Sequence, residues 1–284
     1  MTEKKITIVT DSSSRLPEDA VKGLDVEVIP LWLIWDGECL QDGVDIDPPT
    51  FYQRLRRAKS LPSSSQPTVQ EFMDFFQRLA KKYDTIVNVL VSSKISGTID
   101  NARKAMEKLP SLDIHLVDTL AASMGAGHIV LAAAREAASK ASVESVIKAA
   151  ENLKKKIDFL FLVDTLEYLH KGGRIGGAKR YLGTALRIKP LLEFKNGLIQ
   201  PLEQVRTRKK ALARMMDVAT ERLRGKHMAE ATIVDIDCPE EGDRVAEIVR
   251  KRFSPKNLFR SGVSPVVGTH VGPGAIGFAF YAED

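Results

Sequence analysis

The feature that most constrains the fold is a short apolar strand pattern followed closely by a helical pattern. Residues 85–91 form a run of β-branched and apolar side chains, which is typical of a buried strand. Ala102, Ala105, Met106 and Leu109 then recur at helical spacing. Further strand patterns occur at 5–10, 26–29 and 114–117, and further helix patterns occur at 69–82 and 121–138. Strands that alternate with helices predict βαβ crossovers and a mostly parallel sheet, so we expect an α/β fold.

The chain is long enough, at 284 residues, for two domains of ordinary size. A helical pattern at 143–156 predicts the boundary, which divides the chain into an N-terminal α/β domain, 1–152, and a C-terminal α/β domain, 153–284. We expect a mixed sheet in the second domain. The second half also predicts a helix over 178–186 and an apolar strand that ends at His270.

Turn signals predict two β-hairpins. Asp36-Gly37 lies between the apolar run 30–35 and residues 38–40, and Asn196-Gly197 lies between 189–194 and 198–200. The intervening segment 61–68 is rich in Pro and Ser, which excludes a helix there.

Cysteine content and the start of the chain predict a cytoplasmic protein. Cys39 and Cys238 are far apart and belong to no Cys-x-x-Cys pair, as in proteins of a reducing compartment. The first apolar run, 6–9, is too short for a signal peptide, and no later segment approaches a membrane span. We therefore expect no stable membrane insertion.

Positive charge is concentrated in residues 153–210. This segment contains 14 Lys/Arg and 5 Asp/Glu, so its net charge is 14 − 5 = +9, whereas the whole chain has a net charge of +5. Such a surface suits a nucleic acid, an acidic protein or a phosphate donor, although many basic runs are simply solvated faces. The segment has no recognised motif for reading nucleic acid, so we expect no nucleic-acid partner.

The junction after the strand at 85–91 is rich in hydroxyl groups. Ser96-Gly97-Thr98 precedes a helix whose first N–H groups are unpaired, and this arrangement suits an anion. The alternative is that Ser96 or Thr98 only caps the helix, which is the commoner role of such residues. Two other stretches are candidates for the same anion, namely the Ser64-Ser65 loop and His270 before Gly272-Pro273-Gly274.

The remaining motifs do not indicate a catalyst. The glycine-rich segment 171–177 has neither the Rossmann nor the Walker spacing. The five histidines form no paired metal motif, and no Gly-x-Ser-x-Gly elbow is present. We therefore expect no metal and no cofactor, and a protein that binds a small anion.

Several motifs together resemble the DegV family of bacterial fatty-acid-binding proteins. They occur in the family's order along nearly the whole chain, at residues 10–13, 65–67, 92–98, 117–119, 172–175, 205–208 and 270–274. The resemblance implies a long-chain fatty acid between two α/β domains, with its carboxylate buried and its tail in an apolar tunnel. It also implies a non-enzymatic carrier, the lipid-binding subunit of a fatty acid kinase, which functions in phospholipid metabolism.

Residue roles follow from the same resemblance. Ser64, where the family commonly has threonine, Ser96 and His270 match the residues that hold the carboxylate. The resemblance places four residues nearby, namely Ser65, Ser93, Gly97 and Thr98. Arg206, with Arg174 as a second candidate, matches a contact to the kinase and its phosphate. We expect a monomer that has the fatty acid and a kinase subunit as partners. The alternative function is a free-standing enzyme that acts on a small anionic substrate through Asp11, Asp118 and Ser96.

Overall fold

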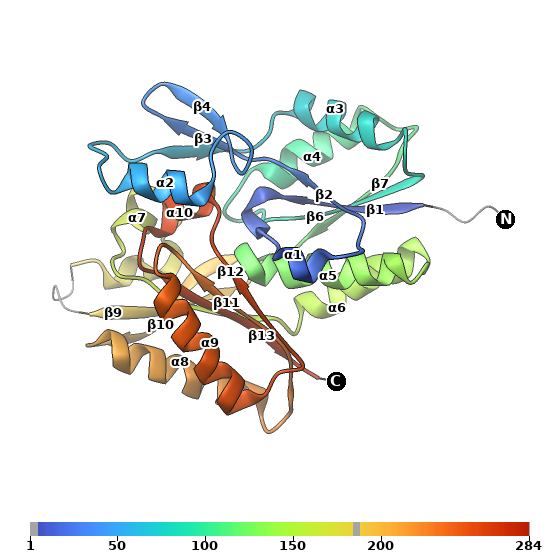
Figure 1. The fold of residues 1–284 in the computed structure, drawn as a ribbon. Helices are drawn as coiled ribbons and strands as arrows, with labels where there is room; N and C mark the ends of the chain where they lie inside the picture. The colour runs from blue at the N-terminus through green and yellow to red at the C-terminus, as the bar shows by residue number, and fades with distance from the viewer. Residues whose placement is uncertain (1–4, 184–187, 284) are drawn as a thin grey trace.

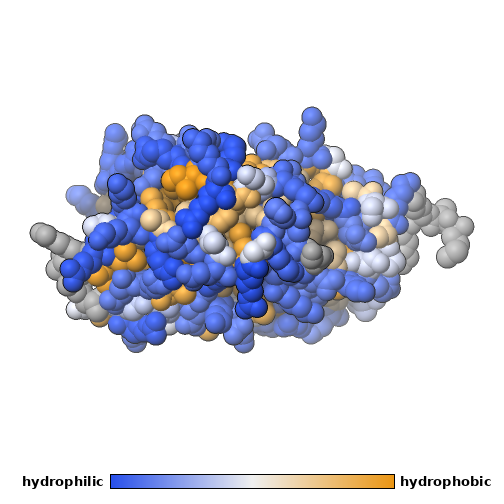
Figure 2. Space-filling model, turned by 90° about the horizontal axis from the view of Figure 1, so that it is seen from below, coloured by the Kyte–Doolittle hydropathy of each residue, from blue (hydrophilic) through white to orange (hydrophobic). Residues whose placement is uncertain are grey.

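The computed structural model describes residues 5–183 and 188–283, and it confirms an α/β fold (Figure 1). The described strands form a four-stranded sheet, a six-stranded sheet and a separate three-stranded sheet. No helix within these two ranges is long and apolar enough to cross a membrane. The face seen in Figure 2 is mainly hydrophilic, and its apolar residues are visible in several separate places.

The four-stranded sheet is parallel, as the alternation of strands and helices predicts. Its order is β2-β1-β6-β7, and every neighbouring pair runs in the same direction. Its strands are β1 (Ile6–Asp11), β2 (Val26–Ile29), β6 (Thr85–Leu90) and β7 (Asp113–Asp118). β2 and β6 lie on opposite sides of β1. The order in which strands are added to the sheet therefore reverses between β1 and β6, although all strands run in the same direction. Ligands of open α/β sheets bind at the carboxyl ends of strands at such a point.

Two pairs of helices cover this parallel sheet. Helices α3 (Val69–Leu79) and α4 (Thr98–Glu107) pack on one face, and α5 (Ser123–Ala138) and α6 (Val143–Lys154) on the other (Figure 1). A 3₁₀ turn, η1 (Ser12–Ser14), and the short helix α1 (Glu18–Val21) connect β1 to β2. The predicted domain boundary at residue 152 falls near the end of α6, and the division at this residue stays a prediction.

The three-stranded sheet is antiparallel and has the order β4-β3-β5. Its elements are β3 (Trp32–Trp35), β4 (Glu38–Gln41) and β5 (Ser63–Ser65), with helix α2 (Pro48–Leu55) between β4 and β5. The predicted hairpin is present, and both Asp36 and Gly37 have positive φ angles, of 50° and 86°. The Pro- and Ser-rich segment is not helical, but it contributes a strand, because Ser64 of β5 pairs with Leu33 of β3.

The six-stranded sheet is mixed and has the order β10-β9-β8-β13-β11-β12. Its strands are β8 (Asp158–Leu162), β9 (Lys189–Lys195), β10 (Leu198–Val205), β11 (Met228–Asp235), β12 (Asn257–Ser261) and β13 (Ile276–Ala282). Only the β11–β12 pair among these described strands is parallel. Helices α8 (Arg208–Leu223) and α9 (Pro239–Phe253) pack on its outer face (Figure 1). The sequence analysis missed β12, a short edge strand in which most side chains are partly exposed.

Two sequence expectations in the second half are wrong. The segment 178–186 does not begin as an α-helix, because the 3₁₀ turn η2 (Gly176–Tyr181) ends before an extended Leu182; residues 184–187 lie outside the described residues. The apolar run before His270 is the helix α10 (Pro265–Val271) rather than a strand. Ser264 starts α10, since its side chain accepts a hydrogen bond from the Val267 N–H, and Pro265 occupies the first turn.

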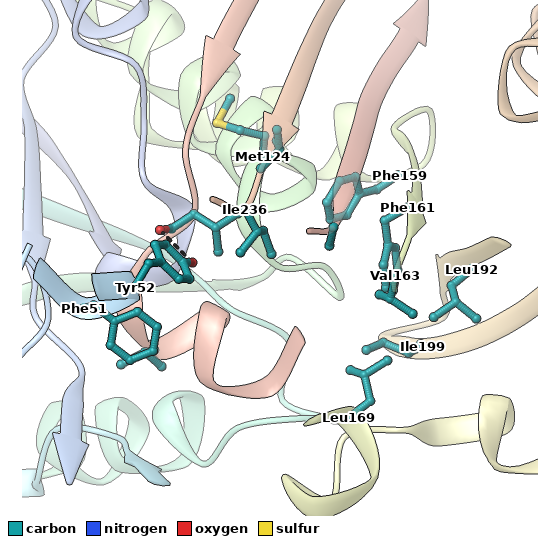
Figure 3. Packing of buried hydrophobic residues seen from close by; sticks show 14 of the residues in the cluster. Phe51, Tyr52, Met124, Phe159, Phe161, Val163, Leu169, Leu192, Ile199 and Ile236 are labelled. Atoms are coloured by element: carbon teal, nitrogen blue, oxygen red, sulfur yellow. Dashed lines mark hydrogen bonds between the residues drawn. The ribbon is translucent and has the colours of Figure 1, made fainter. Parts of the chain in front are cut away.

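The two halves share one hydrophobic cluster. Phe159 and Phe161 from the inner face of the mixed sheet belong to it, and so do Leu31 and Met124 from the first half. In Figure 3, Phe51 and Tyr52 lie at one side of this cluster, and the side chains of β8 lie at the other. The first half therefore covers the inner face of the mixed sheet.

The cap of α10 yields a test of how the position of His270 is set. Ser264→Ala is expected to lower the free energy of unfolding by about 1 kcal/mol, the usual cost of losing an N-cap. Because His270 lies in the last turn of α10, the variant is also expected to shift the NMR signals of the His270 ring. Ser142→Ala, at the cap of α6, serves as the control with a similar loss of stability and unchanged His270 signals. Unchanged signals in Ser264→Ala would show that the cap does not position the ring.

Candidate functional site

A cavity lies between the carboxyl ends of β1 and β6, the inner face of the mixed sheet and α10. The space between its lining atoms is about 930 Å³, including the part that opens to solvent. Most of the lining side chains are apolar: Leu31, Val91, Ile95, Phe159, Phe161, Leu169, Phe194, Ile199, Val234, Ile236, Val263, Val266, Val267 and Val271. The cavity therefore suits a ligand with a large apolar part.

Ser64 and His270 meet in the wall of this cavity. Ser64 Oγ lies 2.7 Å from His270 Nε2, although the two residues are 206 positions apart in sequence. β5 brings in the serine and the last turn of α10 brings in the histidine. Burial, and to a lesser degree the charge of Arg174, lower the pKa of His270 from 6.5 to about 4. The ring is therefore neutral at neutral pH, and its Nδ1 is buried without a hydrogen-bond partner among the described residues.

Arg174 is the cation of this cavity wall. Its Nε donates to the Ile95 carbonyl at 3.1 Å and its Nη1 to the Gly172 carbonyl at 2.7 Å. Its Nη2 donates no hydrogen bond to any residue in the part of the chain that the structure describes, and the side chain is half-buried. The sequence analysis assigned Arg174 to a kinase surface, but the structure brings it into the same cavity as Ser64 and His270.

Ser96 lines the cavity next to Arg174, since the carbonyl that Arg174 contacts belongs to the preceding residue, Ile95. Ser96 Oγ lies 2.8 Å from the hydroxyl oxygen of the buried Thr98. The N-cap of α4 is Gly97, which has no side chain to cap with. Ser96 accepts only a long bond, 3.4 Å, from the Thr98 N–H, so capping explains little of its placement.

The structure adds residues to which the sequence analysis gave no role in the site. Gln66 lines the cavity, and its amide nitrogen lies 3.0 Å from where a Cβ of Gly97 would stand, so a side chain at Gly97 would crowd it. Ser13 and Ser123 also line the cavity, and Ser123 has a positive φ of 50°. These three residues occur in loops or at a helix start, where no periodic pattern could reveal that they share a cavity.

Not all of the remaining predicted site residues lie beside the polar group that Ser64, Ser96, Arg174 and His270 form in the cavity wall. Ser65 lines the cavity, whereas Ser93 does not, because its hydroxyl donates to the Asp118 carboxylate at 2.6 Å. Arg206 is exposed between β10 and α8 and forms no ion pair with the described residues. The structure therefore brings Ser64, Ser65, Ser96, Arg174 and His270 together and leaves Arg206 outside.

The alternative enzyme function would use the carboxylates of Asp11 and Asp118. In the structure both carboxylates accept hydrogen bonds from neighbouring loop residues. Asp11 is fully buried and accepts from the Ser13 N–H, the Ser13 hydroxyl and the Val91 N–H. Burial raises the pKa of Asp11, and these hydrogen bonds oppose that effect. Asp118 accepts from Ser93 and from the Leu120 N–H. Neither carboxylate is among the residues that line the cavity.

Comparisons with known proteins agree on one family. Residues 5–283 match the model of the family described as "Uncharacterised protein, DegV family". The chain is 35% identical over 280 residues to a DegV domain-containing protein of Halalkalibacterium halodurans, which covers 98% of this chain and 99% of the relative.

Solved structures resemble this one over their full length. A DegV family protein from Thermus thermophilus, reported for its fatty acid binding, superposes with a TM-score of 0.90 at 32% identity and covers 98% of this chain and 100% of its own. DegV from Bacillus subtilis, named a fatty acid binding protein, superposes with a TM-score of 0.90 at 30% identity and covers 99% and 100%.

The burial of His270 predicts an unusual titration. An NMR titration of the ligand-free protein is expected to give the His270 ring a pKa near 4. Because the unfolded chain binds this proton near pH 6.5, the free energy of unfolding should fall as the pH drops from 6.5 towards 4. Arg174→Gln should raise the pKa of His270 only in part, since burial is the larger cause, and a bound carboxylate should raise it further. A ring that titrates near 6.5 in the ligand-free protein would contradict this environment.

Proposed function

The chain belongs to the DegV family, and on this premise we propose that it binds a long-chain fatty acid in the cavity between its two α/β domains. The single observation that supports this most is that the cavity is mostly apolar but has a group of polar side chains at one place in its wall. A fatty acid has the same division, with a long hydrocarbon tail and one carboxylate.

The polar group has the chemistry to hold a carboxylate. The hydroxyls of Ser64 and Ser96 are donors, and the neutral ring of His270 also has an N–H. Arg174 supplies the positive charge, and its unused Nη2 is the natural donor for a charge-assisted hydrogen bond. We assign this role to Arg174 in place of the earlier assignment to the kinase surface.

The apolar wall supplies most of the binding free energy in this proposal. Burial of each methylene group is worth about 0.8 kcal/mol, and a long-chain acid has many of them. The polar group then fixes the register of the ligand, because a buried carboxylate without partners costs more than a misplaced methylene.

We further propose that the protein presents the carboxylate to a partner kinase, as the non-catalytic subunit. In that reaction a carboxylate oxygen attacks the terminal phosphorus of ATP on the kinase, the bond from that phosphorus to ADP breaks, and an acyl phosphate forms. A second recess supports access from outside, because Ser64, Arg174 and His270 line it together with Lys59 and Lys171.

Arg206 is the proposed contact to the kinase. It is exposed, and Lys209 and Lys210 at the start of α8 are exposed beside it in sequence. We infer that the carrier acts in the cytoplasm as a monomer, where its two cysteines, both free, fit a reducing compartment. Acyl phosphate formation would link it to phospholipid metabolism.

Native mass spectrometry tests the binding proposal. Protein purified from bacteria is expected to carry the extra mass of a long-chain fatty acid, which is lost on unfolding. Val267→Trp should fill the cavity and lose that mass, whereas Ile248→Trp, on the exposed face of α9, should retain it. A wild-type protein that stays empty in excess palmitate would reject the carrier and favour the enzyme alternative.

Two arginine variants separate the roles of the carboxylate site and the kinase surface. Arg174→Gln is expected to weaken fatty acid binding by about 1.5–3 kcal/mol, the range for hydrogen bonds to charged groups. Arg206→Ala should leave binding unchanged and reduce acyl phosphate formation with the kinase, measured by trapping the product with hydroxylamine. Equal binding by Arg174→Gln and wild type would remove Arg174 from the carboxylate site. An unchanged rate in Arg206→Ala would remove Arg206 from the kinase contact.

A further inference from the structure

Two aromatic rings separate the apolar cavity from a second pocket. Phe159 of β8 and Phe194 of β9 are stacked, with ring centroids 6.0 Å apart and planes 13° from parallel. Both residues line the apolar cavity, and both also line a pocket bordered by the loop 119–121 and by Lys155 and Lys195. The paired rings therefore form a partition between an apolar space and a polar one.

The partition lies at the far end of the cavity from the polar group. Arg174 donates its backbone N–H to Leu169 of α7 (Glu167–Lys171), and α7 follows the carboxyl end of β8. Phe159 is near the opposite end of β8, and a strand advances about 3.3 Å per residue, so four residues to Val163 span roughly 13 Å. Figure 3 shows Leu169, Val163, Phe161 and Phe159 following one another in this order.

The two rings are held differently. A Cβ at Gly125 of α5 would lie 3.2 Å from Phe159 atoms, and one at Gly277 of β13 would lie 2.8 Å from its ring, so two glycines make room for Phe159. Phe159 is 7% exposed, whereas Phe194 is only half-buried and also contacts the Phe161 ring at 6.1 Å. Phe159 is thus fixed by its surroundings, and Phe194 can be removed with less damage to the core.

We propose that the Phe159–Phe194 pair is the end wall of the acyl site and sets the longest chain that the protein accepts. The inference rests on the proposed function, because it assumes a fatty acid whose carboxylate lies near Arg174. A longer tail would have to displace a stacked ring or enter the second pocket, where Arg222 pairs with Asp158 and Glu193. A hydrocarbon tail would gain little binding free energy among these polar groups, so its entry would not offset the cost of displacing the ring.

The test is a competition between fatty acids of different length. Delipidated wild type, Phe194→Ala and Phe161→Leu are each mixed with equal amounts of palmitate, stearate, arachidate and behenate, and the bound masses are measured by native mass spectrometry. Wild type should select the shorter acids. Phe194→Ala should raise the bound ratio of behenate to palmitate about tenfold or more, the scale on which a pocket discriminates small changes in ligand length. Phe161→Leu is the matched control, because Phe161 lines the apolar cavity but not the second pocket.

A dicarboxylic acid provides a second readout. The α,ω-dicarboxylic acid with the chain length of behenate should bind Phe194→Ala better than wild type, because its second carboxylate can then reach Lys155 and Lys195, and adding Lys195→Ala should reduce that gain. A wild type that binds no fatty acid would reject the proposed function itself. If wild type binds but Phe194→Ala keeps the same length profile, or Phe161→Leu shifts it equally, the end wall is rejected while the carrier function stands.

Discussion

The inner face of the mixed sheet is apolar, and its burial is the constraint on which the rest of the structure depends. α8 and α9 cover only the outer face, so Phe159 and Phe161 must be covered by another part of the chain. The first half supplies that cover with residues such as Leu31 and Met124. The cover is incomplete, and the gap that it leaves is the cavity. One hydrophobic cluster therefore both joins the two halves and creates the space for a ligand.

The cost of placing polar groups in this apolar surround explains the arrangement at the head of the cavity. A buried charge must be paired, and Arg174 is held by two backbone carbonyls that leave one nitrogen of its guanidinium without a partner in the described chain. His270 avoids the same cost by remaining neutral. Among the described residues that line the cavity, Arg174 thus carries the one permanent positive charge and the other polar side chains are neutral donors, which matches the single negative charge of the ligand that we propose.

The partition by Phe159 and Phe194 complements this polar end. In the proposed complex the polar end would fix where the ligand begins, and the aromatic wall at the other end of β8 would fix where it ends. Two glycines, Gly125 and Gly277, are needed so that a full ring fits between a helix and a strand. A site that is closed at both ends selects ligands by their length. The apolar wall between the two ends contributes affinity but does not distinguish one chain length from another.

The sequence by itself determined the α/β class, the parallel direction of the strands in the first sheet and the hairpin at Asp36-Gly37, because hydrophobic period and turn chemistry are local properties. It also identified the family through motifs spread along the chain. It failed at α10, where Ser264 and Pro265 mark a helix start that the apolar run concealed, and it missed the partly exposed strand β12. Only the tertiary structure decided that Arg174 faces the cavity with Ser64 and His270 while Ser93 is occupied by Asp118. The physical reason is that Ser64 and His270 are 206 residues apart, so their contact depends on how two separately patterned halves pack and not on any local spacing.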